Sequence, residues 1–303
     1  NVIADISKGR QIMFSVVLPV YNGEKWLGEA IDSVLNQTFA DLELLVVCNG
    51  CDDNSEVVAK AHTVNDTRAR VLSLPVANKS NALNYGICFS KYQWIAPIDA
   101  DDAWYSTKLQ KQFEFIEKNP EIDIVGTHLH YFGSLDEPAP RNPLDHPHIW
   151  ECFLLGKNPI AFSSAAWKKN IHFRGVGFFN TTHFVIEDYE FWQRCIDWNL
   201  KFANLPDDLV MYRLHGDPSK NTVLCGPNGV VKDSFQVDSP VKARQIIAKG
   251  IVDSMYIYCE AIPDGWGLIG HLRRFDQVHP RKKGTPVNST DSTNENKTFN
   301  APE

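Results

Sequence analysis

The sequence predicts an α/β protein with a doubly wound, mostly parallel central sheet flanked by helices. Short apolar runs rich in β-branched residues alternate with segments whose apolar residues recur at helical spacing, four times within residues 14–119. Runs that are apolar throughout are typical of parallel strands buried on both faces. The 303 residues, 43% of them hydrophobic, suffice for one large domain with appendages.

Four predicted strands and four predicted helices alternate in this part of the chain. The strands are residues 14–20, 42–48, 70–74 and 92–98, and the helices are residues 24–39, 56–64, 80–90 and 106–119. The first helix is recognised by apolar residues at helical spacing, such as Leu27 and Ile31. Asp53 or Ser55 is the predicted cap of the second helix, and Ser106 that of the fourth.

The regular alternation stops after residue 132. Residues 133–147, rich in Pro, Gly and Asp, are predicted to form a loop. Later segments are predicted as a short helix at 147–155, a helix at 187–198, a strand at 207–214 and a long helix at 240–261. From residue 282 the sequence is polar and poor in apolar residues, which predicts a disordered tail.

The composition argues against two classes of partner. The formal net charge is −7, and the basic cluster at residues 281–283 is short, so no nucleic-acid surface is predicted. No apolar run approaches the roughly 20 residues that a membrane span needs. The first residues lack the apolar core of a signal peptide. We therefore expect a cytoplasmic protein, with at most peripheral contact to a membrane surface, and free thiols at its seven cysteines.

An acidic cluster directly follows the fourth predicted strand. The stretch "PIDADDAW", residues 97–104, holds Asp99, Asp101 and Asp102. Ligands of doubly wound sheets bind beyond the carboxyl ends of the strands, and Mg²⁺ is typically held by one or two carboxylates together with substrate phosphates. The cluster alone is equally compatible with a turn that caps the helix beginning near Ser106. The strand before it and three earlier βα units favour a metal–phosphate site.

Several stretches occur in a characteristic order. They are "FSVVLPVYNGEKWLGEAIDSVLNQTFADLELLVV" (14–47), "NKSNALNYGI" (78–87), "WIAPIDADDAW" (94–104), "QFEFIEKNPEIDIVG" (112–126), "IEDYEFWQR" (186–194) and "YRLH" (212–215). Each is common alone, but the ordered set resembles the family-2 glycosyltransferases, which have the GT-A fold. The resemblance covers residues 14–219, about two thirds of the chain.

The resemblance implies transfer of a sugar, with inversion, from a nucleotide-diphosphate donor to a hydroxyl group in glycan or polysaccharide biosynthesis. A UDP-sugar is favoured, carrying a hexose or an N-acetylhexosamine, and the acceptor is expected to be a glycan or a lipid-linked carrier. The implied organisation is a lead-in (1–13), a GT-A domain (14–220) with a nucleotide-binding half (14–132) and an acceptor half (133–220), a helical extension (221–281) and a disordered tail (282–303).

The donor side of the site is implied by residues that match the family's motifs. The first nucleotide-binding loop is matched by Pro19, Tyr21, Asn22 and Glu24. Asp99 and Asp101, with Ala100 between them, match the family's Asp-x-Asp, which holds the ribose and Mn²⁺ or Mg²⁺. Lys79 resembles a position near the diphosphate, and His215 resembles one that approaches the metal or diphosphate. A solvated lysine and a hydrogen-bonded structural histidine are the alternatives.

The acceptor side is implied by Asp188, which matches the catalytic base, with Glu187 beside it. Trp104 directly follows the acidic cluster and is expected to stack on a sugar, whereas most of the other aromatic residues are expected in the core. The attacking hydroxyl must lose a proton, which a carboxylate within hydrogen-bonding reach can accept. A divalent cation would neutralise the charge that develops on the leaving diphosphate. The helix dipole by itself also favours acidic residues in a first turn, and it is expected to keep Asp188 ionised at neutral pH.

One turn departs from the family's pattern. Where the family has Asp-Asp-Gly-Ser after the second strand, this chain has "CNGCDD", with Cys48 and Asn49 in place of the aspartates. The Asn49 amide can still bond a nucleotide base, so base contact remains the prediction while the choice of base stays open. Two rival functions are a non-catalytic nucleotide-sugar-binding module, which this turn favours, and a nucleotidyltransferase. The latter would need a Gly-rich basic loop that "PVYNGEKW" does not supply.

Overall fold

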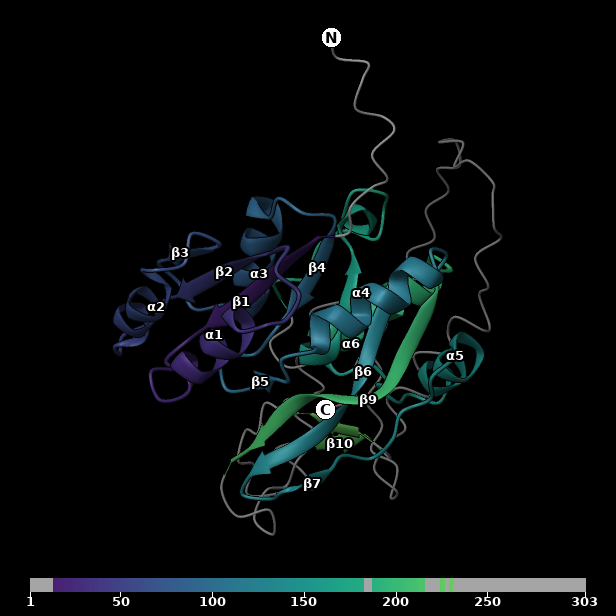
Figure 1. Ribbon diagram of the computed structural model, residues 1–303. Helices are drawn as coiled ribbons and strands as arrows, with labels where there is room; N and C mark the ends of the chain where they lie inside the picture. Colours follow the sequence, from purple (N-terminus) through teal and green to yellow (C-terminus); the bar gives the residue numbers. More distant parts are fainter. Residues whose placement is uncertain (1–12, 183–186, 216–223, 227–228, 232–303) are drawn as a thin grey trace, which may run out of the picture.

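The computed structural model describes residues 13–182, 187–215, 224–226 and 229–231. The strands of its central sheet are β1 (Phe14–Val20), β2 (Leu42–Asn49), β3 (Ala69–Leu74), β4 (Trp94–Pro97), β5 (Ala103–Trp104), β6 (Ile124–Gly133), β7 (Glu137–Pro138), β8 (Ala166–Lys168) and β9 (Phe202–Leu214). They pair in the order β3-β2-β1-β4-β8-β6-β9-β5, with β7 beside β6 (Figure 1).

The first four strands are parallel, as predicted. β1 pairs with both β2 and β4, and β2 pairs with β3. Every residue of β1 and β2 is buried, which explains why both runs are apolar almost throughout. The helices between these strands are α1 (Leu27–Leu35), α2 (Ser55–Thr63) and α3 (Lys79–Phe89). The predicted alternation is confirmed, although α1 is shorter at both ends than predicted.

The remaining strands add mixed pairing. β8 runs antiparallel to both β4 and β6, whereas β6 and β9 run parallel to each other. β8 therefore brings residues of the predicted acceptor half between two strands of the predicted nucleotide-binding half, and both halves share one sheet. The remaining helices are α4 (Lys108–Lys118), α5 (His146–Leu154) and α6 (Glu187–Asp197), with short 3₁₀ turns η1 (Phe162–Ser164) and η2 (Lys169–His172).

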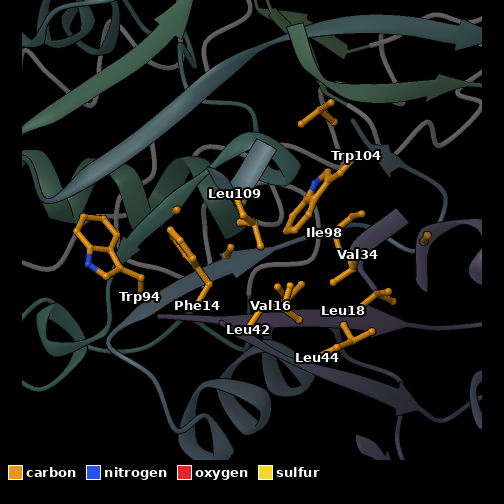
Figure 2. Packing of buried hydrophobic residues seen from close by; sticks show 14 of the residues in the cluster. Phe14, Val16, Leu18, Val34, Leu42, Leu44, Trp94, Ile98, Trp104 and Leu109 are labelled. Carbon is orange, nitrogen blue, oxygen red and sulfur yellow. The ribbon is translucent and has the colours of Figure 1, made fainter. Parts of the chain in front are cut away.

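Two apolar cores lie on opposite faces of the sheet. Val16 and Leu18 of β1 belong to the core that also contains residues of α1, α2 and α4, whereas Val17 belongs to the core with α3, α5 and α6. This alternation follows from the two-residue period of a strand. Figure 2 shows the first core, in which Leu109 of α4 and Trp104 of β5 join Val16 and Leu18 of β1.

Local signals decide where several helices begin. At α5 the Asp145 carboxylate accepts a hydrogen bond from the backbone nitrogen of His148 (3.2 Å). At α2 the N-cap residue is Asn54 and no side chain caps the helix, so the prediction of Asp53 or Ser55 as the cap is wrong. The Asp53 carboxylate does accept a hydrogen bond from the backbone nitrogen of Ser55 (2.9 Å). α4 begins later than predicted, after Thr107, and no side chain caps it, so the prediction for Ser106 is wrong.

Part of the predicted C-terminal region falls within the described residues. β10 (Leu224–Gly226) and β11 (Gly229–Val231) pair as antiparallel strands inside the segment predicted to be a helical extension. The predicted helix at 240–261 and the predicted tail at 282–303 lie outside the described residues. In the part of the chain that the structure describes, no helix is long and apolar enough to cross a membrane.

Gly50, in the turn after β2, adopts a conformation that other residues reach only with strain. Its φ is +66°, and a Cβ placed there would lie 2.4 Å from the backbone nitrogen of Ala77. We expect Gly50→Ala to lower the free energy of unfolding by about 1–3 kcal/mol, measured by urea titration. Gly177→Ala is the matched control, because its φ is +81° but its Cβ would meet only a side-chain atom of Arg194, at 3.4 Å. Equal losses in both variants would contradict a backbone clash at Gly50.

Candidate active site

Three turns meet at the carboxyl ends of the parallel strands: residues 21–24 after β1, 49–55 after β2 and 99–102 after β4. The parallel pairing of β1 with β2 and β4 brings these turns to one edge of the sheet. Doubly wound proteins bind their ligands at this edge. The candidate site is therefore built on turns carried by a rigid sheet.

The turns after β1 and β2 are fastened together by hydrogen bonds. The backbone nitrogen of Gly23 donates to Ser55 Oγ (2.8 Å), and that of Glu24 donates to Asp53 Oδ2 (3.0 Å). In return, the backbone nitrogen of Asn54 donates to Glu24 Oε2 (2.9 Å). The Glu24 side chain, predicted to contact a nucleotide, thus also holds the neighbouring turn in place.

The other residues predicted for the first nucleotide-binding loop occupy different environments. Tyr21 is 56% exposed and stays a predicted ligand contact. Asn22 has a φ of +50° and is hydrogen-bonded to Asp52 of the turn after β2. Pro19 is buried within β1, so its side chain shapes the end of the strand and does not face a ligand.

Asn49 has a structural role in place of the predicted base contact. Its side chain is 2% exposed. Its Nδ2 donates to the backbone carbonyl of Val20 (2.6 Å), and its Oδ1 accepts from the backbone nitrogen of Asn78 (2.9 Å). An ionised aspartate has no hydrogen to donate to Val20. The change from the family's aspartate therefore fits a residue that joins β1, β2 and the start of α3.

The three clustered aspartates have three different environments. The Asp99 carboxylate lies 3.0 Å from Lys79 Nζ and is mostly buried. Asp102 is 1% exposed and accepts hydrogen bonds from Ser163 Oγ (2.6 Å) and from the backbone nitrogen of Arg213 (3.0 Å). Asp102 therefore shapes the turn, whereas the more exposed Asp101 stays a predicted ligand contact.

Asp101 lies beside His215, which comes from the end of β9. Asp101 Oδ2 and His215 Nε2 are 2.7 Å apart, and both side chains are partly exposed. Arg213, which was not predicted as a site residue, fixes the same turn because its Nε donates to the Asp101 carbonyl (2.9 Å). Its guanidinium also lies between the rings of Trp26 (3.9 Å) and Phe132 (4.0 Å). Arg213 could have been found from the sequence, because it lies in the same "YRLH" stretch as the predicted site residue His215.

The pair formed by Asp101 and His215 fits the requirements of a divalent cation. Mg²⁺ and Mn²⁺ accept carboxylate oxygens, Mn²⁺ also accepts imidazole nitrogen, and a protein commonly supplies one or two ligands while substrate phosphates complete the set. Among the described residues no group of three or more His, Cys, Asp or Glu side chains could hold a metal alone. These two residues could therefore hold an ion that a diphosphate completes.

Lys79, in the first turn of α3, contacts both predicted parts of the site. Its Nζ lies 3.0 Å from Asp99 Oδ1 and 3.0 Å from Glu187 Oε1. The same ammonium group lies 4.7 Å from the centre of the Phe162 ring. Glu187, predicted on the acceptor side, is 3% exposed and is paired with this lysine, so it does not present a free carboxylate to an acceptor.

Asp188 is a half-buried carboxylate in the first turn of α6. Loss of solvent, followed by the negative charge of Glu187, raises its pKa to about 7, against the lowering effects of Lys79, the Tyr189 backbone and Asn158. Asn158 Nδ2 donates to Asp188 Oδ2 (3.0 Å), an interaction that the sequence did not indicate. The expectation that the helix dipole would keep Asp188 fully ionised is therefore wrong, because burial and Glu187 outweigh it.

Trp104 belongs to the core and not to the acceptor side. Its ring is 2% exposed, and its Nε1 donates to the Ser163 carbonyl (2.8 Å). Lys108 Nζ lies 3.9 Å from the centre of the ring. Lys108 is itself fully buried, which lowers its pKa far below the usual range. The predicted stacking of Trp104 on a sugar is therefore wrong.

The comparison with known proteins decides the family. Residues 15–185, more than half of the chain, match the sequence model of glycosyl transferase family 2.

The chain belongs to glycosyltransferase family 2.

This family-2 glycosyltransferase is similar to the O-antigen biosynthesis glycosyltransferase WbnJ of Escherichia coli, with 28% identity over 257 residues that cover 82% of this chain and 96% of WbnJ. The predicted family is confirmed.

Two solved structures share the fold of this family-2 glycosyltransferase. Staphylococcus aureus TarS in complex with UDP-GlcNAc superposes with a TM-score of 0.59 at 17% identity, covering 82% of this chain and 68% of TarS. Pyrobaculum calidifontis mannosyltransferase PcManGT, in complex with GDP-Man and Mn²⁺, superposes with a TM-score of 0.57 at 14% identity, covering 91% and 74% of the two chains. These similarities confirm the predicted GT-A fold.

Proposed function

We propose that this glycosyltransferase moves a sugar, with inversion at the anomeric carbon, from a nucleoside-diphosphate donor to a hydroxyl group of a glycan or lipid-linked acceptor. One observation carries the proposal: Lys79 contacts both Asp99 and Glu187 at 3.0 Å, and so joins the Asp-x-Asp turn to the start of α6. Asp101 belongs to that turn, and Asp188 directly follows Glu187 at the start of α6. Asp101 is proposed to serve the leaving group and Asp188 the attacking hydroxyl.

The donor side of the proposed mechanism rests on Asp99, Asp101 and His215. Asp101 and His215 are the residues that would hold Mn²⁺ or Mg²⁺, and Asp99 is proposed to meet the ribose. When bound, such an ion neutralises negative charge on the departing diphosphate. A UDP-hexose or UDP-N-acetylhexosamine is the proposed donor. Support comes from the UDP-GlcNAc bound to TarS and from the O-antigen role of WbnJ. Because PcManGT binds GDP-Man, the experiment below also includes guanine nucleotides.

The acceptor side rests on Asp188. A hydroxyl group becomes a better nucleophile as it loses its proton, and a carboxylate whose pKa lies near 7 is a stronger base than an ordinary aspartate while remaining partly ionised at neutral pH. The Asn158 amide donates to one oxygen of Asp188 and so orients the carboxylate. Only the ionised form can accept the proton, so the rate should rise as the pH increases through about 7.

The proposed function is tested by adding UDP, GDP and their sugar conjugates, each with and without Mn²⁺, to the full chain. We expect one nucleotide to raise the melting temperature only when Mn²⁺ is present. The matching sugar nucleotide should then glycosylate an oligosaccharide or lipid-linked acceptor, with the inverted anomer identified by NMR. A melting shift with a sugar nucleotide but no transfer to any acceptor would favour the non-catalytic nucleotide-sugar-binding module. Cleavage of a phosphate bond without sugar transfer would favour a nucleotidyltransferase.

A further inference from the structure

α3 and its N-cap residue Asn78 are hydrogen-bonded to the segment that precedes α6. Asn84 Nδ2 donates to the Phe179 carbonyl (2.8 Å), and the backbone nitrogen of Phe179 donates to Asn84 Oδ1 (2.9 Å). Asn78 Nδ2 donates to the Thr181 carbonyl (2.9 Å). The partners of these bonds lie about a hundred positions apart in sequence. The start and middle of α3 therefore hold residues 179–181 of the predicted acceptor half in place through hydrogen bonds.

Lys79 lies on the same part of α3 and adds a charged link. Its ammonium group is shared between Asp99 and Glu187, at 3.0 Å from each, and lies over the Phe162 ring. The Glu187 side chain is only 4% exposed. A carboxylate this buried needs a positive partner, because the loss of water is otherwise uncompensated. Lys79 thus holds Glu187, and with it the first turn of α6, against the turn after β4.

We propose that Lys79 is a positioning residue for Asp188, linking the base to the donor side through its ion pairs with Glu187 and Asp99. This inference rests on the proposed function, because it assumes that Asp188 takes the acceptor's proton. Lys79 acts through other residues and need not contact either substrate. It differs from the phosphate contact predicted from the sequence, because its ammonium group is already shared between two carboxylates.

Two charged groups act on Asp188 from the elements around it. Glu187, beside it on α6, disfavours the ionised carboxylate and raises the pKa, whereas Lys79 from α3 favours the ionised carboxylate and lowers the pKa. The neutral Asn158, from the segment between α5 and η1, also lowers the pKa of Asp188 by donating a hydrogen bond. Removing Lys79 or Glu187 should therefore move the ionisation of Asp188 in opposite directions.

The test compares the pH dependence of kcat/KM in Lys79→Met and Glu187→Gln. Loss of the positive charge should move the rise of the Lys79→Met profile to higher pH, by roughly one pH unit. Loss of the negative charge should move the Glu187→Gln profile to lower pH by a similar amount. Raising the pH should then restore much of the Lys79→Met rate, which a merely misfolded site would not allow. Lys79→Arg keeps the charge and should retain the parent profile.

Lys168→Met is the matched control. Lys168 also pairs with a carboxylate, Asp123 at 3.0 Å, and lies near an aromatic ring, Trp94, but it is on β8 outside the site. Its profile should equal that of the parent. If Lys79→Met does not fold, the Glu187→Gln shift and the Lys79→Arg profile still decide the question.

Two results would overturn the inference. The first is an unchanged pH profile in Lys79→Met, combined with a donor KM raised more than tenfold, which would make Lys79 a donor contact. The second is an unchanged profile in Glu187→Gln. A fully active Asp188→Asn variant would show that another group is the base, whereas absence of sugar transfer by the parent protein would overturn the proposed function, so failure of the two ideas can be told apart.

Discussion

Asp188→Asn is expected to lower the rate of sugar transfer by about 10²- to 10⁴-fold, the range that a positioned general base contributes. The amide cannot accept the acceptor's proton, yet it has nearly the same shape as the carboxylate. Its oxygen can still accept a hydrogen bond from the backbone nitrogen of Tyr189, which donates to Asp188 at 2.7 Å in the parent protein. The fold and the donor side should therefore be preserved, and the loss should appear in kcat.

The measurement is transfer under donor saturation, with donor affinity determined separately by calorimetry. Asp197→Asn provides the matched control, because Asp197 ends the same helix and is exposed. Its rate should equal that of the parent protein. A donor affinity that falls together with the rate in Asp188→Asn would show that this carboxylate serves the donor. Unchanged turnover would show that another group is the base.

Asp101→Asn is expected to abolish the stabilisation that Mn²⁺ and the nucleotide give together, and to lower transfer by about 10²-fold or more. The amide removes the negative charge that would face the cation. It keeps the size of the side chain, and the contact between Arg213 and the backbone carbonyl of residue 101 remains available. Electron paramagnetic resonance measures the binding of Mn²⁺ in the presence of the nucleotide, and this measurement does not depend on catalysis.

Asp136→Asn is the matched control for this experiment. Asp136 also pairs with a histidine, His130, at 2.6 Å, but this pair lies on β6 and the residues that follow it. Breaking an equivalent aspartate–histidine pair there should leave Mn²⁺ binding and transfer unchanged. If both variants bind Mn²⁺ as the parent does, Asp101 is not a ligand, and the ion must be held elsewhere.

The parallel part of the fold could be predicted because each strand and helix is recognisable from its own residues. Strands that are buried on both faces must be apolar throughout, as β1 and β2 are, and the helices between them show their own period. β8 and the early part of β9 could not be predicted in this way. β8 has three residues, and its place between β4 and β6 is set by antiparallel pairing with strands far away in the sequence.

The role of a site residue could be predicted only where its position in a motif determines that role. Asp101 and Asp102 are neighbours, yet the partners that bury Asp102 come from residues 61 and 111 positions away. The Asn49 amide and the Trp104 ring looked available for ligands because their buried partners are likewise distant. For Asp188 the helix position was correct, but its pKa depends first on loss of solvent, which is set by the fold and cannot be read from the neighbouring residues.

The insertion of β8 between β4 and β6 also bears on how the chain is made. A ribosome releases β4 well before β8, so the edge of β4 stays uncovered while the following segment is synthesised. β9 can pair with β5 and β6 only after its own residues have emerged, so these long-range pairings complete the sheet after its parallel strands have been synthesised. The end of β9 carries Arg213 and leads to His215, so the turn that holds Asp101 acquires its partners last. Catalytic competence should therefore arise together with completion of the sheet.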